Sequence, residues 1–141
     1  MPISFFCEDV KYNLKNRLLI KRWIKETIRL ENSSTGSINY IFTSDNNLLR
    51  INKEYLKHNY YTDIITFNYC EENIISGDIY ISIDTVANNA AYFGVTFIEE
   101  LFRVMVHGIL HLIGYNDSKD EEKLIMRQKE NFYLERLKNL F

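Results

Sequence analysis

The feature that most constrains this chain is one long apolar segment, residues 97–113, in which two histidines stand four positions apart. Apolar side chains surround His107 and His111 almost without interruption, namely Val104, Met105, Val106, Ile109, Leu110, Leu112 and Ile113. A helix that is apolar on nearly every side belongs in a protein interior. Thr96 can cap its start, and Gly114 permits the left-handed turn that ends a helix. The sequence therefore predicts a buried, central helix over about 97–113.

The spacing of His107 and His111 places both imidazoles on one face of that helix, about one turn apart. Asp117 follows the helix end and can fold back toward them. Two histidines and a carboxylate, with a fourth position left to water, are typical of a catalytic zinc site, where the pKa of the water falls to about 7. The alternatives are that the histidines are ordinary packing groups, or that Asp120 or a water replaces Asp117 as the third ligand.

The rest of the chain predicts strands mixed with helices, without a regular alternation. We expect strands at 2–7, 38–43, 63–68 and 78–83, helices at 11–30, 45–57, 85–92 and 119–140, and a loop at 33–37. This pattern favours an α+β fold: a mixed sheet of about four strands packed with helices, with the metal-binding helix central. A length of 141 residues, with no internal repeat or linker, favours one domain over residues 1–141.

Composition narrows the classes of function. A net charge of −2 argues against a protein that coats nucleic acid non-specifically. Residues 11–30 nevertheless carry seven lysines and arginines against Glu26, either as a solvated face or as an electrostatic guide for RNA phosphates. Cys7 and Cys70 stand far apart, as expected of thiols in a reducing cytoplasm. No secretory signal or membrane-spanning run is visible, so we expect a cytoplasmic protein that does not contact the membrane.

Four segments resemble those of a known family. His107-Gly-x-x-His111-Leu-x-Gly114-Tyr115 is similar to the signature H-G-x-L-H-L-x-G-Y-D-H of the YbeY family. Upstream, residues 52–55, 62–67 and 77–82 resemble its N-x-E-Y, T-D-V-L-S-F and G-D-I-x-I-S segments, in the family's order. The resemblance implies a zinc-dependent endoribonuclease that acts on precursor rRNA, with the ribosomal small subunit or its associated proteins as partners, and the same α+β arrangement.

Two positions depart from the family pattern. The last ligand, normally a third histidine, is Asp117, and the arginine that usually follows N-x-E-Y is Leu56. A carboxylate leaves the site one charge less positive, so it should acidify bound water less. It also makes the ligand set harder, which loosens the preference for Zn²⁺ over Mn²⁺ or another divalent ion.

Three more residues are candidates for the site. Arg103 lies one turn before His107 and is a candidate phosphate clamp that supplies the charge Leu56 lacks; the alternative is an ion pair with Glu99 or Glu100. Asp63 is a candidate catalytic residue, although capping of a turn beside Thr62 explains it equally well. His58 is a candidate for substrate binding.

The leading hypothesis is a metal-dependent endoribonuclease for single-stranded RNA, active in rRNA maturation and in ribosome assembly or quality control. One rival is a ribosome-associated assembly factor whose metal is structural and which cleaves RNA weakly or not at all. Another is a small metallohydrolase with a different substrate. A metalloprotease is less favoured, because Gly108 stands where the H-E-x-x-H motif has its glutamate base.

Overall fold

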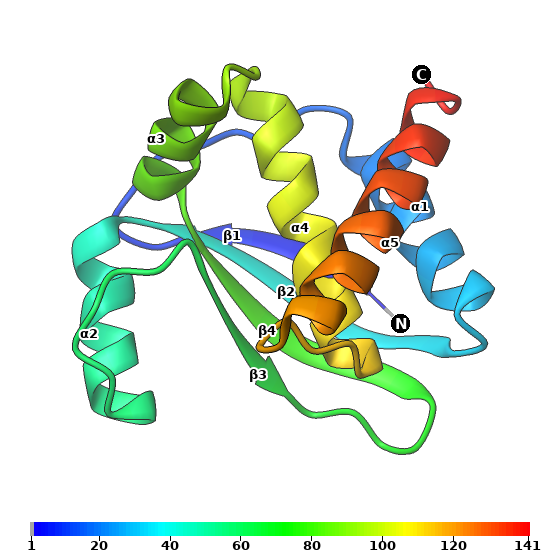
Figure 1. Cartoon of the computed structure of the whole chain (residues 1–141), viewed down its shortest axis with the longest axis horizontal. Coiled ribbons are helices and arrows are strands. Elements are labelled where there is room, and N and C mark those ends of the chain that lie inside the picture. The colour runs from blue at the N-terminus through cyan, green and yellow to red at the C-terminus, as the bar shows by residue number, and fades with distance from the viewer. Residues whose placement is uncertain (1) are drawn as a thin grey trace.

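A four-stranded mixed sheet forms the frame of the computed structural model, which describes residues 2–141 (Figure 1). In chain order the elements are β1 (Ile3–Cys7), α1 (Arg17–Leu30), β2 (Ser34–Thr43), α2 (Asp45–Leu56), β3 (Ile64–Asn68), β4 (Ile74–Ser82), α3 (Ile83–Phe93), α4 (Phe97–Ile113) and α5 (Asp120–Lys138). The spatial strand order is β1-β2-β4-β3. The first three of these run parallel, and β3 is an antiparallel edge strand beside β4. The α+β fold with four strands is thus confirmed.

The sheet buries both of its faces, but to different extents. Ile75, Ile79 and Ile81 of β4 point into the main core, which α1, α4 and α5 complete. On the opposite face, α2 covers β3 and β4 with a small cluster of Leu48 and Ile51 against Ile65. The alternation along β4 follows from the pleat of a strand, which sends successive side chains to opposite faces.

The helix α4 lies across the sheet at the centre of the molecule, with α5 crossing over it and α3 beside its start (Figure 1). Its bounds, Phe97–Ile113, are those that the sequence predicts. Thr96 and Glu99 form a reciprocal capping box at its start, and Gly114 ends it with a φ of 125°. Leu101, Met105, Val106, Ile109 and Leu110 are fully buried, as expected of a central helix.

Three predicted starts are wrong by four residues or more: those of α1, β2 and β4, the last of which begins at Ile74 rather than at residue 78. The helix expected from residue 11 begins only at Arg17, because Asn16 adopts the left-handed conformation with a φ of 60°. Lys11 and Lys15 therefore do not belong to the basic face of α1. The loop expected at 33–37 is largely strand: β2 begins at Ser34, where pairing with β4 outweighs the polar composition, and an irregularity in register lies between Thr35 and Ile38.

None of the helices in residues 2–141 combines the length and the hydrophobicity that crossing a membrane requires.

Candidate metal centre and its surroundings

Close packing of α4 on the sheet sets the position of the candidate metal centre. A Cβ atom added to Gly108 would lie 2.9 Å from Cδ1 of Ile64, so glycine lets the helix approach β3. Below the end of the helix, a Cβ on Gly77 would lie 2.5 Å from the backbone oxygen of Phe67 and 3.1 Å from both methyl groups of Leu112. A glycine within a strand often marks such a close approach. The helix therefore rests directly on β3 and β4, with its two histidines on the open side.

Three potential ligands converge beyond this contact. The Nε2 atoms of His107 and His111 lie 2.9 Å apart. The Oδ2 atom of Asp117 lies 3.2 Å from the first of them and 3.3 Å from the second. The turn at Gly114 reverses the chain and brings the carboxylate back over the helix end. Within residues 2–141, this is the one group of histidine, cysteine and acidic side chains close enough to share a metal ion.

The Nδ1 contacts of the two histidines show that both Nε2 atoms are free to bind a cation. His107 Nδ1 lies 2.6 Å from a carboxylate oxygen of Glu130, and His111 Nδ1 lies 3.0 Å from the backbone oxygen of Tyr115. Both partners are acceptors, so in the neutral rings each Nδ1 carries the proton and donates it. The two Nε2 lone pairs then face each other and the Asp117 carboxylate. A cation is the group that such an arrangement stabilises.

The dimensions fit a divalent metal. Zinc binds imidazole nitrogen at 2.0–2.1 Å, so two ligands of a tetrahedral ion lie about 3.3 Å apart. The three distances among His107 Nε2, His111 Nε2 and Asp117 Oδ2 are 2.9, 3.2 and 3.3 Å, close to this ligand–ligand separation. The side chain of Asp117 is 42% exposed, so solvent reaches the cluster on the side away from α4. Two nitrogens and one oxygen with an open position form the ligand set of a catalytic rather than a structural ion.

Glu130 on α5 contacts the candidate metal centre, and sequence reasoning did not identify it. It is buried, and its second oxygen accepts a hydrogen bond of 2.9 Å from Arg103. Burial alone would raise the pKa of Glu130, but the hydrogen bonds from His107 and Arg103 outweigh it and lower the pKa. A carboxylate that receives the second N–H of a ligating histidine fixes the orientation of the ring and makes it a better ligand.

The charge balance of the cluster attracts a positive ion. Burial acts to lower the pKa of His107, but the hydrogen bond to Glu130 and the negative charges of Glu130, Asp117 and Asp63 raise it overall. His107 therefore lies where the surrounding carboxylates stabilise a positive charge. The same carboxylates would stabilise a bound divalent ion.

Arg103 shares the histidine face of α4, as its spacing predicts. Its partners, however, lie on α5: Nη1 donates to Glu130, and Nη2 donates to Oδ1 of Asn131 at 2.9 Å. An ion pair with Glu99 or Glu100 is not what the structure forms; Glu99 instead caps the helix start. Arg103 also lines a cavity of about 500 Å³ between α4 and α5, which neither histidine lines. A phosphate clamp at Arg103 stays a prediction.

Asp63 and His58 lie in the connection between α2 and β3. Burial raises the pKa of the Asp63 carboxyl, while the positive charge of a protonated His107 acts to lower it, which places this carboxyl near the cluster. Thr62 donates its hydroxyl hydrogen to the backbone oxygen of Ile64, as a turn-forming residue does. His58 lines a second cavity, which His111 also lines. Both candidates thus lie close to the candidate metal centre, and their roles stay predictions.

Comparison with known proteins adds three kinds of similarity. The family described as Endoribonuclease YbeY matches residues 3–138. A protein of that description from Parabacteroides distasonis is 47% identical over 93% of this chain and 92% of its own length. Another from Azobacteroides pseudotrichonymphae is 42% identical over 99% and 100%. A solution structure of a Thermotoga maritima protein superposes with a TM-score of 0.67 at 30% identity, covering 96% of this chain and 89% of that one.

Proposed function

The chain belongs to the YbeY family of endoribonucleases, and from this premise we propose that it hydrolyses single-stranded regions of precursor ribosomal RNA. As a member of that family it is a hydrolase of phosphodiester bonds. We further propose that the enzyme binds one divalent ion, Zn²⁺ or a similar metal such as Mn²⁺. We also propose that it acts in the cytoplasm, in association with the small ribosomal subunit or the proteins bound to it.

The observation that carries the metal-dependent part of this proposal is the pair of facing Nε2 atoms, 2.9 Å apart, whose rings are oriented by acceptors at both Nδ1 positions. We propose His107, His111 and Asp117 as the ligands. When bound, the ion supplies Lewis-acid polarisation of a phosphoryl oxygen and a source of nucleophile at neutral pH.

The protein's own groups have distinct tasks in this proposal. Glu130 holds the ring of His107 in the ligating orientation. Arg103 keeps a guanidinium beside the same carboxylate, from where it can contact a phosphate oxygen of the RNA. Asp63, a carboxyl whose pKa is raised by burial, can hold a proton near the cluster during hydrolysis. His58 contacts the RNA from the neighbouring cavity.

Cleavage by the purified protein tests the proposal. We expect the zinc-loaded protein to cut a single-stranded RNA, a chelator to abolish cleavage, and added zinc to restore it. His107→Ala and Asp117→Ala should each lose bound metal and cleavage together, whereas Asp117→His, which restores the family's ligand, should keep the metal.

Tyr92→Ala serves as the control, because Tyr92 is 84% exposed on α3 and belongs to no part of the proposed site. Its metal content and cleavage should equal those of the unaltered protein. Zinc-loaded protein that binds ribosomes but leaves every RNA intact would contradict the proposal and favour an assembly factor. Normal metal content in Asp117→Ala would remove Asp117 from the ligand set.

A further inference from the structure

A second cavity adjoins the candidate metal centre on the side of α2. It has a volume of about 390 Å³, within the range of small-molecule sites. Its lining includes Leu56 at the end of α2, and His58 and Tyr60 from the connection that follows. Its lining also includes Ile64 at the start of β3 and His111, one of the three proposed metal ligands. A molecule bound there would lie against a proposed metal ligand.

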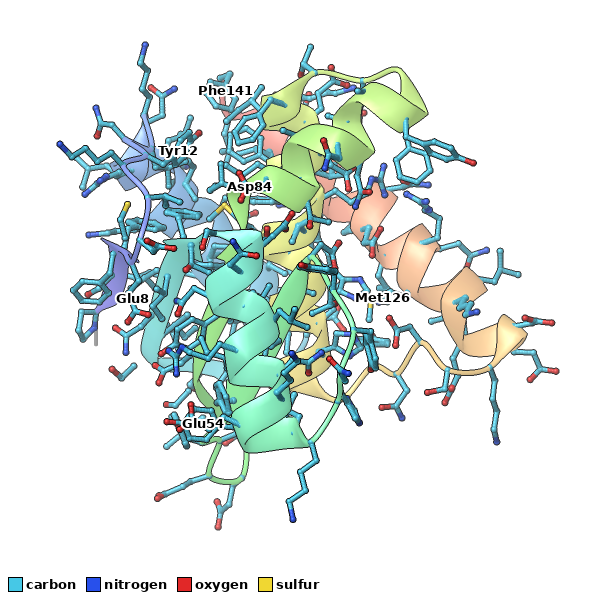
Figure 2. All side chains as sticks on the ribbon, turned by 90° about the vertical axis from the view of Figure 1, so that its left-hand side faces the viewer. Glu8, Tyr12, Glu54, Asp84, Met126 and Phe141 are labelled. Carbon is cyan, nitrogen blue, oxygen red and sulfur yellow. The ribbon has the colours of Figure 1, made fainter. Side chains whose placement is uncertain are left out.

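The connection that forms this cavity is held in place by one buried side chain. Asn52 on α2 is only 2% exposed, and its amide nitrogen donates to the backbone oxygen of Tyr60 at 3.0 Å. Its backbone oxygen accepts from the backbone N–H of His58, also at 3.0 Å. Lys57 between them takes the left-handed conformation that ends α2. Figure 2, which looks onto α2, shows the connection rising beside the helix on the side of α5.

The rings of His58 and Tyr60 in this connection stack on each other and leave an aromatic surface exposed to solvent. His58 and Tyr60 are stacked, with 5.2 Å between ring centroids and 19° between ring planes. The Tyr60 hydroxyl and His58 Nδ1 lie 3.0 Å apart, which ties the rings to each other. Tyr60 remains 56% exposed although its backbone is fixed. An exposed ring that is held rigid loses little conformational entropy when a flat ligand covers it.

We propose that the His58–Tyr60 ring pair stacks on a nucleobase next to the scissile phosphate, making this cavity the subsite that selects single-stranded RNA. The inference rests on the proposed function and names how that site recognises its substrate. Bases in a duplex are stacked on their neighbours, whereas unpaired bases are free to stack on aromatic side chains. Such stacking depends on the π-face that all bases share, so the subsite tolerates any base.

Variants of Tyr60 test the proposal through binding and kinetics. The probe is a short single-stranded RNA that carries 2-aminopurine, whose fluorescence falls when it is stacked, added to zinc-loaded protein. Tyr60→Ala should weaken binding and raise KM about 5- to 150-fold, the equivalent of losing one stacked base, with kcat changed little. Tyr60→Phe, which keeps the ring but loses the hydroxyl contact to His58, should bind much more like the unaltered protein than like the alanine variant. Tyr60→Leu, which keeps apolar bulk without a π-face, should resemble the alanine variant.

A base-paired hairpin and Tyr92→Ala provide the comparisons. The preference for single-stranded RNA over the hairpin should shrink in Tyr60→Ala and stay unchanged in Tyr92→Ala. Equal binding by Tyr60→Ala and the unaltered protein would overturn the inference, as would a phenylalanine variant as weak as the alanine variant. If no variant cleaves RNA but fluorescence quenching still depends on the ring of Tyr60, the base subsite is supported and the nuclease proposal fails.

Discussion

At the scale of single residues, the candidate metal centre depends on a carboxylate that is not one of its ligands. Glu130 accepts from His107 through one oxygen and from Arg103 through the other, so it links the ring of a candidate ligand to a guanidinium. It comes from α5, whereas both of its partners come from α4. The relative position of the two helices therefore decides where the ligand ring points.

We predict that Glu130→Ala lowers metal affinity about 10- to 100-fold, the usual effect of removing the partner of a ligating histidine. Without its acceptor, the His107 ring can rotate or change tautomer, and Nε2 no longer points at the metal. Competition with a chromophoric chelator measures the affinity. Glu135→Ala on the same helix is the matched control, since that side chain is 68% exposed. Equal affinities for the two variants would show that Glu130 does not orient the ring.

The sequence was enough to predict those residues of the candidate metal centre that lie close together along the chain, but not Glu130. Helical spacing predicted that His107 and His111 share a face, and the turn expected at Gly114 predicted that Asp117 folds back toward them. Glu130 stands in α5, a helix rich in charged residues, where its position resembles any solvated one. Its burial depends on how α5 packs on α4, and periodicity within a single segment carries no information about that.

At the scale of elements, Gly77 allows the end of α4 to pack closely on the sheet. The strand β4 can lie under the helix end because this residue adds no side chain between Leu112 and the backbone of β3.

Gly77→Ala should therefore destabilise the protein by about 1–3 kcal/mol, the typical cost of overpacking a dense interior. The added methyl group would meet a backbone oxygen, which cannot move away as a side-chain tip can. Urea denaturation gives the free energy of unfolding. Asn88→Ala, an exposed change on α3, should stay within about 0.5 kcal/mol of the unaltered protein. A Gly77 variant as stable as this control would mean that the contact is loose.

The boundaries of an element could be predicted where capping residues mark its ends. They could not be predicted where the local sequence is typical of another structure. Thr96, Glu99 and Gly114 bound α4 by local hydrogen bonding, which the sequence displays directly. The start of α1 depends on the left-handed backbone of Asn16, a conformation that asparagine permits but does not require. The first residues of β2 are strand because β4 lies beside them, a long-range cause that their polar composition conceals.

At the scale of the whole molecule, Glu31 joins three separate parts of the chain. It follows α1 and accepts hydrogen bonds from Tyr115 at 2.6 Å, from Lys129 at 3.1 Å and from Tyr133. These partners belong to the turn after α4 and to α5. Burial acts to raise the pKa of Glu31, but the three hydrogen bonds lower it overall. The ionised carboxylate is thus the form that stabilises the fold.

Because the folded protein lowers the pKa of Glu31, its contribution to stability is complete above the unfolded value of about 4.3 and is lost as pH falls through the folded pKa. Glu31→Gln should cost about 1–3 kcal/mol at pH 7, and the difference from the unaltered protein should shrink below about pH 4. Urea denaturation at several pH values measures this. Glu72→Gln, exposed between β3 and β4, should show no such dependence. A Glu31 difference that is constant with pH would contradict the assignment.

The three proposed ligands all lie within residues 107–117, on one helix and the turn that follows it. An ion held there does not fasten distant stretches of chain together, as the zinc of a small finger domain does. The hydrophobic core and the sheet hold this architecture without it. Removal of the proposed ion should therefore abolish RNA cleavage and leave the fold intact, and adding the metal back should restore cleavage without any refolding step.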